Sequence, residues 1–144
     1  MKDETTKQLT AWLGVAAAVV SLLAFFGITS WNELTKTVFP KRAAKDACRQ
    51  AWDATRTFNA YMKKRDSISA RDSAVIQIYA KRLGEAKAKT NNDNLKAAFD
   101  ANIYSLTKLA EALEEKTGGA NGFGDQSEED GRTWSSLCRG IWRD

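Results

Sequence analysis

The chain has 144 residues, no histidine, two cysteines and a formal net charge of +4. The absence of histidine excludes Ser-His-Asp and Cys-His nucleophilic centres, histidine-containing zinc sites and HExxH helices, and two cysteines cannot supply a four-thiolate site. No other catalytic, cofactor or metal motif is recognisable, so we expect a protein that is not an enzyme and that holds neither a metal nor a cofactor.

The first predicted element is a transmembrane helix, which follows a short head over residues 1–8. No charged residue falls between Lys7 and Glu33. The apolar run of 23 residues inside this interval reaches about 35 Å as a helix, enough to cross a ~30 Å hydrocarbon core. With its less apolar extension the span covers residues 9–39, and the Phe-Pro pair at its end is the expected joint to a soluble domain, residues 40–144.

The apolar run is longer than the hydrophobic region of a cleaved signal peptide, and no convincing cleavage site follows it. These features favour an uncleaved signal anchor. Small residues recur within the run at every fourth position, a spacing that lets two membrane helices approach closely but is also common in any membrane helix. We retain self-association through this face as an alternative, and its residues are Gly14, Ala17, Ala18 and Ser21.

The soluble domain begins with a basic amphipathic helix over residues 41–66. Its apolar side chains follow three-and-four spacing, which places them and Cys48 on one buried face. A second helix begins at Ser69, where Asp72 supplies the acidic partner of a capping box, and runs to about Lys89. Cations gather at the end of this helix, where they interact favourably with its dipole.

A third helix begins at Leu95, and we expect Gly118 and Gly119 to end it. The segment 117–131 holds five glycines and four acidic residues, which predicts a flexible surface loop. A short helix with Cys138 on its apolar face closes the chain. The predicted fold class is therefore all-α, with one N-terminal transmembrane helix followed by a small bundle of three longer helices and one short C-terminal helix. Four aromatic residues are expected in the core: Trp52, Phe58, Phe99 and Trp134.

Cys48 and Cys138 lie on the buried faces of the first and last predicted soluble helices. A disulfide between them would close a loop of about 90 residues and stabilise the domain by roughly 4 to 5 kcal/mol on the chain-entropy treatment. Such a bridge requires an oxidising compartment. The alternative is a pair of unlinked thiols packed as small apolar groups. We favour the bridge because a domain of this size benefits from a covalent link.

The positions of the cysteines also carry a resemblance. The segments 46–49 (DACR) and 134–138 (WSSLC), with alanine- and lysine-rich helices between them, resemble uncharacterised bacterial membrane-anchored or secreted helical-bundle proteins stapled by one end-to-end disulfide. The resemblance covers the layout of residues 41–141 and implies no particular activity. An anchor followed by helices is also similar to the inner-membrane spanins of phage lysis systems, from which the glycine-rich segment and the number of helices depart.

Two observations disagree about which side of the membrane the domain occupies. Four basic residues within 15 positions after the apolar run, against about three positive groups before it, mildly favour a cytoplasmic domain. The paired cysteines favour the outside, and the charge rule weakens for flanking domains longer than ~60 residues. We therefore expect a single-pass protein of the cytoplasmic membrane whose soluble domain is extracytoplasmic.

Charge is unevenly distributed within the domain. Residues 41–89 hold 13 basic and 5 acidic residues, a net charge of +8, whereas residues 90–131 hold 3 and 9, a net charge of −6. The two stretches can neutralise each other in the bundle, or the basic stretch can contact an outside polyanion. Within it, Lys63, Lys64 and Arg65 are candidate contacts for phosphates of lipid or nucleic acid, and cations at a helix end are the simpler explanation.

The leading hypothesis is a non-enzymatic binding or structural module, displayed outside the cytoplasmic membrane, whose partners are the lipid bilayer and an unidentified protein. The alternative is a membrane-tethered regulatory module that faces the cytosol and contacts anionic lipid or nucleic acid through its basic half. This alternative predicts free thiols and salt-sensitive binding. Nucleic acid is the less favoured partner, because the sequence contains no recognised nucleic-acid-binding motif.

Overall fold

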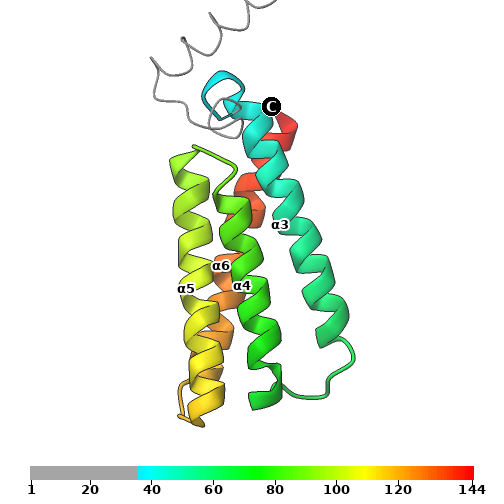
Figure 1. Ribbon diagram of the computed structural model, residues 1–144, viewed down its shortest axis with the longest axis vertical. Helices are drawn as coiled ribbons and strands as arrows, with labels where there is room; N and C mark the ends of the chain where they lie inside the picture. The colour runs from blue at the N-terminus through cyan, green and yellow to red at the C-terminus, as the bar shows by residue number, and fades with distance from the viewer. Residues whose placement is uncertain (1–35) are drawn as a thin grey trace, which may run out of the picture.

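The computed structural model describes residues 36–144, which form a four-helix bundle (Figure 1). Consecutive helices run in opposite directions, and α3 packs beside both α4 and α6. The C-terminus of the chain lies beside the start of α3 (Figure 1). The elements are α3 (Pro40–Met62), the 3₁₀ turn η1 (Ala70–Asp72), α4 (Ser73–Lys87), α5 (Asp93–Glu115) and α6 (Ala120–Arg143).

The all-α bundle is confirmed, but the predicted fold class is corrected in one respect: the described residues contain no transmembrane helix. Within residues 36–144, no helix combines the length and the apolar character that a membrane crossing requires. Most of the predicted span over residues 9–39 lies outside the described residues. The four proposed helix-packing positions, Gly14, Ala17, Ala18 and Ser21, lie outside them as well.

The joint predicted before the soluble domain is present. Residues 36–38 are helical, but Phe39 leaves the helical conformation with φ −127° and ψ 62°, and α3 begins at the next residue. Pro40 causes this break, because its ring disfavours helical dihedrals at the preceding residue while its own fixed φ suits the first turn of a helix. The sequence thus separates α3 from whatever precedes it.

The predicted flexible loop over residues 117–131 is wrong, because α6 covers this segment from residue 120 onward. As a result, the last helix has 24 residues and is not short. Contacts with α5 explain the difference: Asn102 Nδ2 donates to the carbonyl of Ser127 over 2.9 Å. Gly131 faces the same side chain, because a Cβ added there would lie in van der Waals contact with Asn102 Oδ1, at 3.7 Å. This packing offsets the ~1 kcal/mol that each interior glycine costs a helix.

The two ends of α5 are defined differently. Asn92 Oδ1 accepts a hydrogen bond from the backbone amide of Leu95 over 2.9 Å, which caps the first turn as its side-chain type predicts. At the other end the helix stops at Lys116, whose φ of 54° places it in the left-handed region. The expectation that Gly118 and Gly119 end the helix is therefore wrong by two to three residues.

The core lies mainly between α4, α5 and α6. Phe99 and Trp134 are 0% and 1% exposed, and their ring centroids are 5.5 Å apart. Both were predicted core residues, whereas Trp52 and Phe58 are half-buried and pack against its edge. Large buried side chains come from these three helices, but the buried residues of α3 are small: Ala43, Ala44, Ala47, Cys48, Ala51 and Ala54.

Candidate functional site

The predicted disulfide is confirmed. Cys48 of α3 and Cys138 of α6 are bonded, their Cα atoms lie 5.6 Å apart, and both residues are fully buried. The bridge joins the first half of α3 to the last two turns of α6, so it holds in place the one helix among α3 to α6 that lacks large core side chains. Neither sulfur is available as a nucleophile or a metal ligand, and among residues 36–144 no group of thiols or carboxylates is placed to hold a metal ion.

The predicted basic contact over residues 63–65 is divided between two roles. Lys63 and Lys64 are exposed in the turn after α3, and neither pairs with a carboxylate of the described chain. Arg65 is different, because its Nε lies 3.3 Å from Asp72 Oδ1 and its guanidinium donates to the hydroxyl of Tyr61. Arg65 therefore acts as a structural residue at the far end of α3.

Asp72 is the one charged residue that is buried among those described. Its carboxylate accepts hydrogen bonds from the backbone amide of Ser69 over 2.8 Å and from the hydroxyl of Tyr61 over 2.8 Å. The bond from Ser69 lowers the pKa of this carboxyl most, and the bond from Tyr61 comes second. The charge of Arg65 lowers the pKa less, and burial of the carboxyl opposes all three. The predicted capping box is confirmed, and it leaves Asp72 ionised and fully engaged, a poor acid or base for catalysis.

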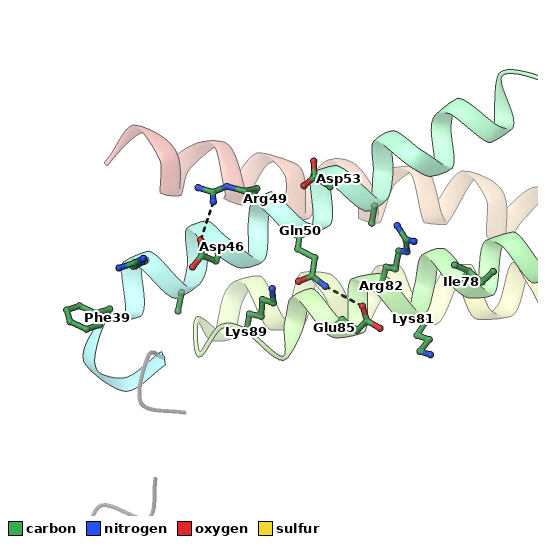
Figure 2. Close-up of a pocket in the computed structure, with 13 residues that line it drawn as sticks. Phe39, Asp46, Arg49, Gln50, Asp53, Ile78, Lys81, Arg82, Glu85 and Lys89 are labelled. Atoms are coloured by element: carbon green, nitrogen blue, oxygen red, sulfur yellow. Dashed lines mark hydrogen bonds and ion pairs between the residues drawn. The ribbon is translucent and has the colours of Figure 1, made fainter. Parts of the chain in front are cut away.

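A groove of about 910 Å³ lies between the first half of α3 and the second half of α4. Its floor includes Ala43 and Ala54, whose small side chains leave room between the helices. Figure 2 shows Gln50 reaching from α3 to Glu85 of α4, where its Nε2 donates over 3.4 Å. This weak bridge is the one hydrogen bond between described side chains that crosses the groove. We call this feature the α3–α4 groove.

Positive charge predominates along the α3–α4 groove, which is lined by five basic and three acidic residues. Arg49 pairs with Asp46 over 3.7 Å within α3. In Figure 2, Arg82 extends from α4 toward α3. Four of the five cations are exposed and form no ion pair with any described carboxylate: Arg42, Lys81, Arg82 and Lys89.

The basic and acidic stretches of the domain hardly neutralise each other. Among the described residues, one ion pair joins residues 41–89 to residues 90–131, from Lys87 of α4 to Asp100 of α5. The remaining ion pairs lie within one stretch or the other, or join Arg132 to Glu128 one turn apart in α6. Direct ion pairs within residues 36–144 therefore neutralise little of this charge, and most cations of the basic stretch remain exposed.

A second hollow, of about 630 Å³, lies on the other side of the start of α3, where α6 ends. The indole of Trp142 is its aromatic wall, with Lys45 Nζ 5.4 Å and Arg49 Cζ 5.8 Å from the ring centroid. Trp52 supports the indole from the core side, with the two ring centroids 6.2 Å apart. Arg42, Asp46 and Arg49 line both hollows.

Sequence reasoning missed the α3–α4 groove because it treated each helix separately. The cations at the end of α4 were attributed to the helix dipole, and nothing indicated that they would face the basic side of α3. Reasoning also missed Asn102, which is 1% exposed and accepts at Oδ1 from Trp134 Nε1 over 3.0 Å. Its signal was present, because Asn102 follows Phe99 by three residues and precedes Leu106 by four on the apolar stripe.

Comparisons with protein families, with curated proteins and with solved structures found no match for this chain. The resemblance in layout to membrane-anchored or secreted bacterial bundles thus stays a prediction.

Proposed function

We propose that this bundle is a non-enzymatic binding module that works in an oxidising compartment and holds an acidic segment of a partner protein in the α3–α4 groove. The observation that carries the proposal is the set of four exposed groove cations that form no ion pair with a carboxylate of residues 36–144. A lysine or arginine side chain that is already held in a groove needs only an approaching carboxylate to form an ion pair, so the groove is complementary to negative charge.

The dimensions of the groove favour a helical segment. The groove follows α3 from Arg42 to Ala54, which corresponds to about 18 Å, or roughly three turns of a helix laid alongside. Phe39 and Ile78 also line it and are 57% and 55% exposed, so apolar contacts are available as well as charges. An amphipathic helix with acidic residues beside its apolar stripe fits this combination, a recognised mode of peptide binding.

The disulfide supports the choice of compartment, because structural disulfides persist in secreted, periplasmic and cell-surface proteins and are rare in the cytosol. An extracytoplasmic location is accordingly part of the proposal. The alternative of a cytosolic module that binds nucleic acid predicted free thiols, and the bonded cysteines argue against it.

The test is calorimetric titration of the full, oxidised chain with a peptide probe: an acidic amphipathic helix of about four turns, compared with a version whose acidic residues are replaced by glutamine. We expect the acidic peptide to bind and the glutamine version to bind more weakly. Binding should also weaken between about 50 and about 500 mM salt, because exposed ion pairs are screened.

Two triple variants of equal charge make the test specific. Lys81→Gln, Arg82→Gln and Lys89→Gln together remove groove cations, and we expect roughly tenfold weaker binding, since exposed ion pairs contribute about 0.2–1 kcal/mol each. Lys63→Gln, Lys64→Gln and Arg71→Gln remove three exposed cations outside the groove and should leave affinity nearly unchanged. Equal losses in both variants, or none in either, would exclude the groove as the binding site.

A further inference from the structure

We propose that the end of the bundle where α3 begins and α6 finishes docks on an anionic lipid surface. We call this region the aromatic end, and it comprises Val38, Phe39 and Trp142 with the cations Lys41 and Lys45. Phe39, Arg42 and Arg49 line the α3–α4 groove as well. Lys41, Lys45 and Trp142 do not line it, so changes at these three residues test the aromatic end separately from the groove.

The first observation is a concentration of exposed apolar side chains. Six large apolar side chains are exposed among the described residues, and three of them lie at the aromatic end: Val38 at 52%, Phe39 at 57% and Trp142 at 41%. Scattered single exposures need no explanation, but a cluster of aromatic and aliphatic side chains at one end marks an interaction surface. Tryptophan is also a residue type that favours the boundary between water and lipid.

The second observation is the charge around these side chains. The hollow at the aromatic end is lined by four basic residues and by one acidic residue, Asp46, which pairs with Arg49. One of the four, Lys41, also donates to the backbone oxygen of Asp144. Lys45 and Arg49 extend over the indole of Trp142, so that apolar surface and cations occupy the same patch. Long basic side chains can keep their charge at lipid headgroups while their methylene stems cover apolar surface.

The position of the patch distinguishes a lipid surface from a peptide. Val38 and Phe39 precede α3, and Trp142 lies in the last turn of α6, so these side chains sit at the end of the bundle. A peptide helix requires an elongated groove with two walls, which the bundle provides between α3 and α4. A bundle end that presents apolar side chains within a rim of cations suits shallow insertion into anionic headgroups.

The experiment uses tryptophan fluorescence of the full chain with Trp12, Trp31 and Trp52 replaced by phenylalanine. Trp142 then reports on the aromatic end, and buried Trp134 serves as the internal reference. The chain is mixed with phosphatidylcholine vesicles containing about 30% phosphatidylglycerol, in which the acyl chains are brominated near the headgroup to quench nearby indoles. We expect quenching of Trp142, and the further change Trp142→Phe should abolish it.

Charge-matched variants provide the control. Lys41→Gln with Lys45→Gln should lower the ratio of protein docked on vesicles to free protein roughly 30-fold. Each cation near an anionic surface contributes on the order of 1 kcal/mol to docking. Lys63→Gln with Lys64→Gln, at the other end of α3, should leave quenching unchanged. This control also tests the basic contact predicted from the sequence.

Three results would overturn the proposal. Trp142 could remain unquenched in anionic vesicles, which is also the result expected if an acidic protein is the true occupant. Quenching could be equal in brominated phosphatidylcholine alone, which would mean that negative charge is not recognised. Equal losses in the two double variants would show that general attraction by a basic protein, and not the aromatic end, brings the chain to the surface.

Discussion

Helix α3 and the three helices behind it are held in place by different means. Helices α4, α5 and α6 interlock through large buried side chains, with Leu83, Phe99 and Trp134 among the least exposed in the structure. Helix α3 places five alanines and Cys48 against them. Because a buried methyl group contributes only about 0.8 kcal/mol, those five alanines supply about 4 kcal/mol, no more than the disulfide can supply alone.

This contrast explains why the α3–α4 groove exists. A helix with large inward side chains would fill the space beside α4, whereas an alanine-faced helix fills less of it. Helix α3 is held by a covalent link, a few polar contacts and contacts at the edge of the core, such as Phe58 on Tyr79. The two parts should therefore respond differently to mutation. The three predictions below test that difference in order of decreasing effect.

Removing the disulfide should have the largest effect. We expect Cys48→Ala with Cys138→Ala to lower the free energy of unfolding by about 4 to 5 kcal/mol. The disulfide closes a loop of about 90 residues and so lowers the conformational entropy of the unfolded chain, and the double variant removes this constraint. Urea unfolding of the full chain measures this loss. Amide hydrogen exchange should accelerate more in α3 than in α5.

Equal acceleration of exchange in α3 and α5 would contradict the comparison, because it would mean that the disulfide stabilises all four helices alike. A mass-tagged maleimide gives an independent measurement of the bond. Under denaturing conditions the parent chain should react only after reduction. A chain that reacts without reductant would remove the basis for placing the domain in an oxidising compartment.

Removing Asn102 should have an intermediate effect and should act on the other part of the bundle. Asn102→Ala leaves the buried Trp134 Nε1 without its partner and removes the additional bond to the Ser127 carbonyl, and an unpaired buried polar group costs about 1–3 kcal/mol. Urea unfolding measures the change. Gln77→Ala, which removes an exposed hydrogen bond to Glu114, is the control and should cost less than about 0.5 kcal/mol. Similar losses for both would show that Asn102 is not a structural node.

The smallest effect at neutral pH concerns the far end of α3, where Asp72 links it to η1. The pKa of Asp72 is lowered in the folded state, so its contribution to stability is complete above its unfolded pKa of about 3.9. That contribution is lost as the pH falls through the folded pKa, when protonation weakens the bonds from Ser69, Tyr61 and Arg65.

Urea midpoints measured from about pH 7 to about pH 2 should therefore decline steeply at the acid end for the parent chain. Asp72→Asn should decline less over the same range. Asp53→Asn, which changes an exposed carboxylate of α3, is the control and should follow the parent. If Asp72→Asn and the parent show parallel profiles, the buried carboxylate is not the group whose protonation weakens this end of α3.

Local patterns in the sequence were sufficient for most of the fold. Three-and-four spacing located α3, α4 and α5, Ser69 with Asp72 predicted the cap before α4, and Cys48 and Cys138 were correctly paired. The errors arose where tertiary contacts override local preference. The first half of α6 is helical because Ser127 contacts Asn102 of α5 and because Ala120 and Phe123 pack against the core, which composition alone cannot indicate.

The candidate site was less predictable than the fold, because it belongs to the space between helices. The cations of α3 and α4 were visible in the sequence, but their convergence depends on how closely the two helices approach. The small residues Ala43 and Ala54 set this approach. From the sequence they indicated that one face of α3 is buried, but not how close α4 would lie. Likewise, Val38 and Trp142 are 104 positions apart in the sequence, and only the antiparallel path of α3 and α6 brings them to one end.

The bond between Cys48 and Cys138 has one more consequence, which concerns breakage of the chain. The three connections that join α3, α4, α5 and α6, at residues 63–72, 88–92 and 116–119, lie between the two cysteines. Exposed turns of this kind are where proteases cut. A single cut in any of them leaves both fragments joined through sulfur, so the nicked protein remains one molecule that separates into two pieces only on reduction. A cut at one of these turns therefore does not by itself release a fragment.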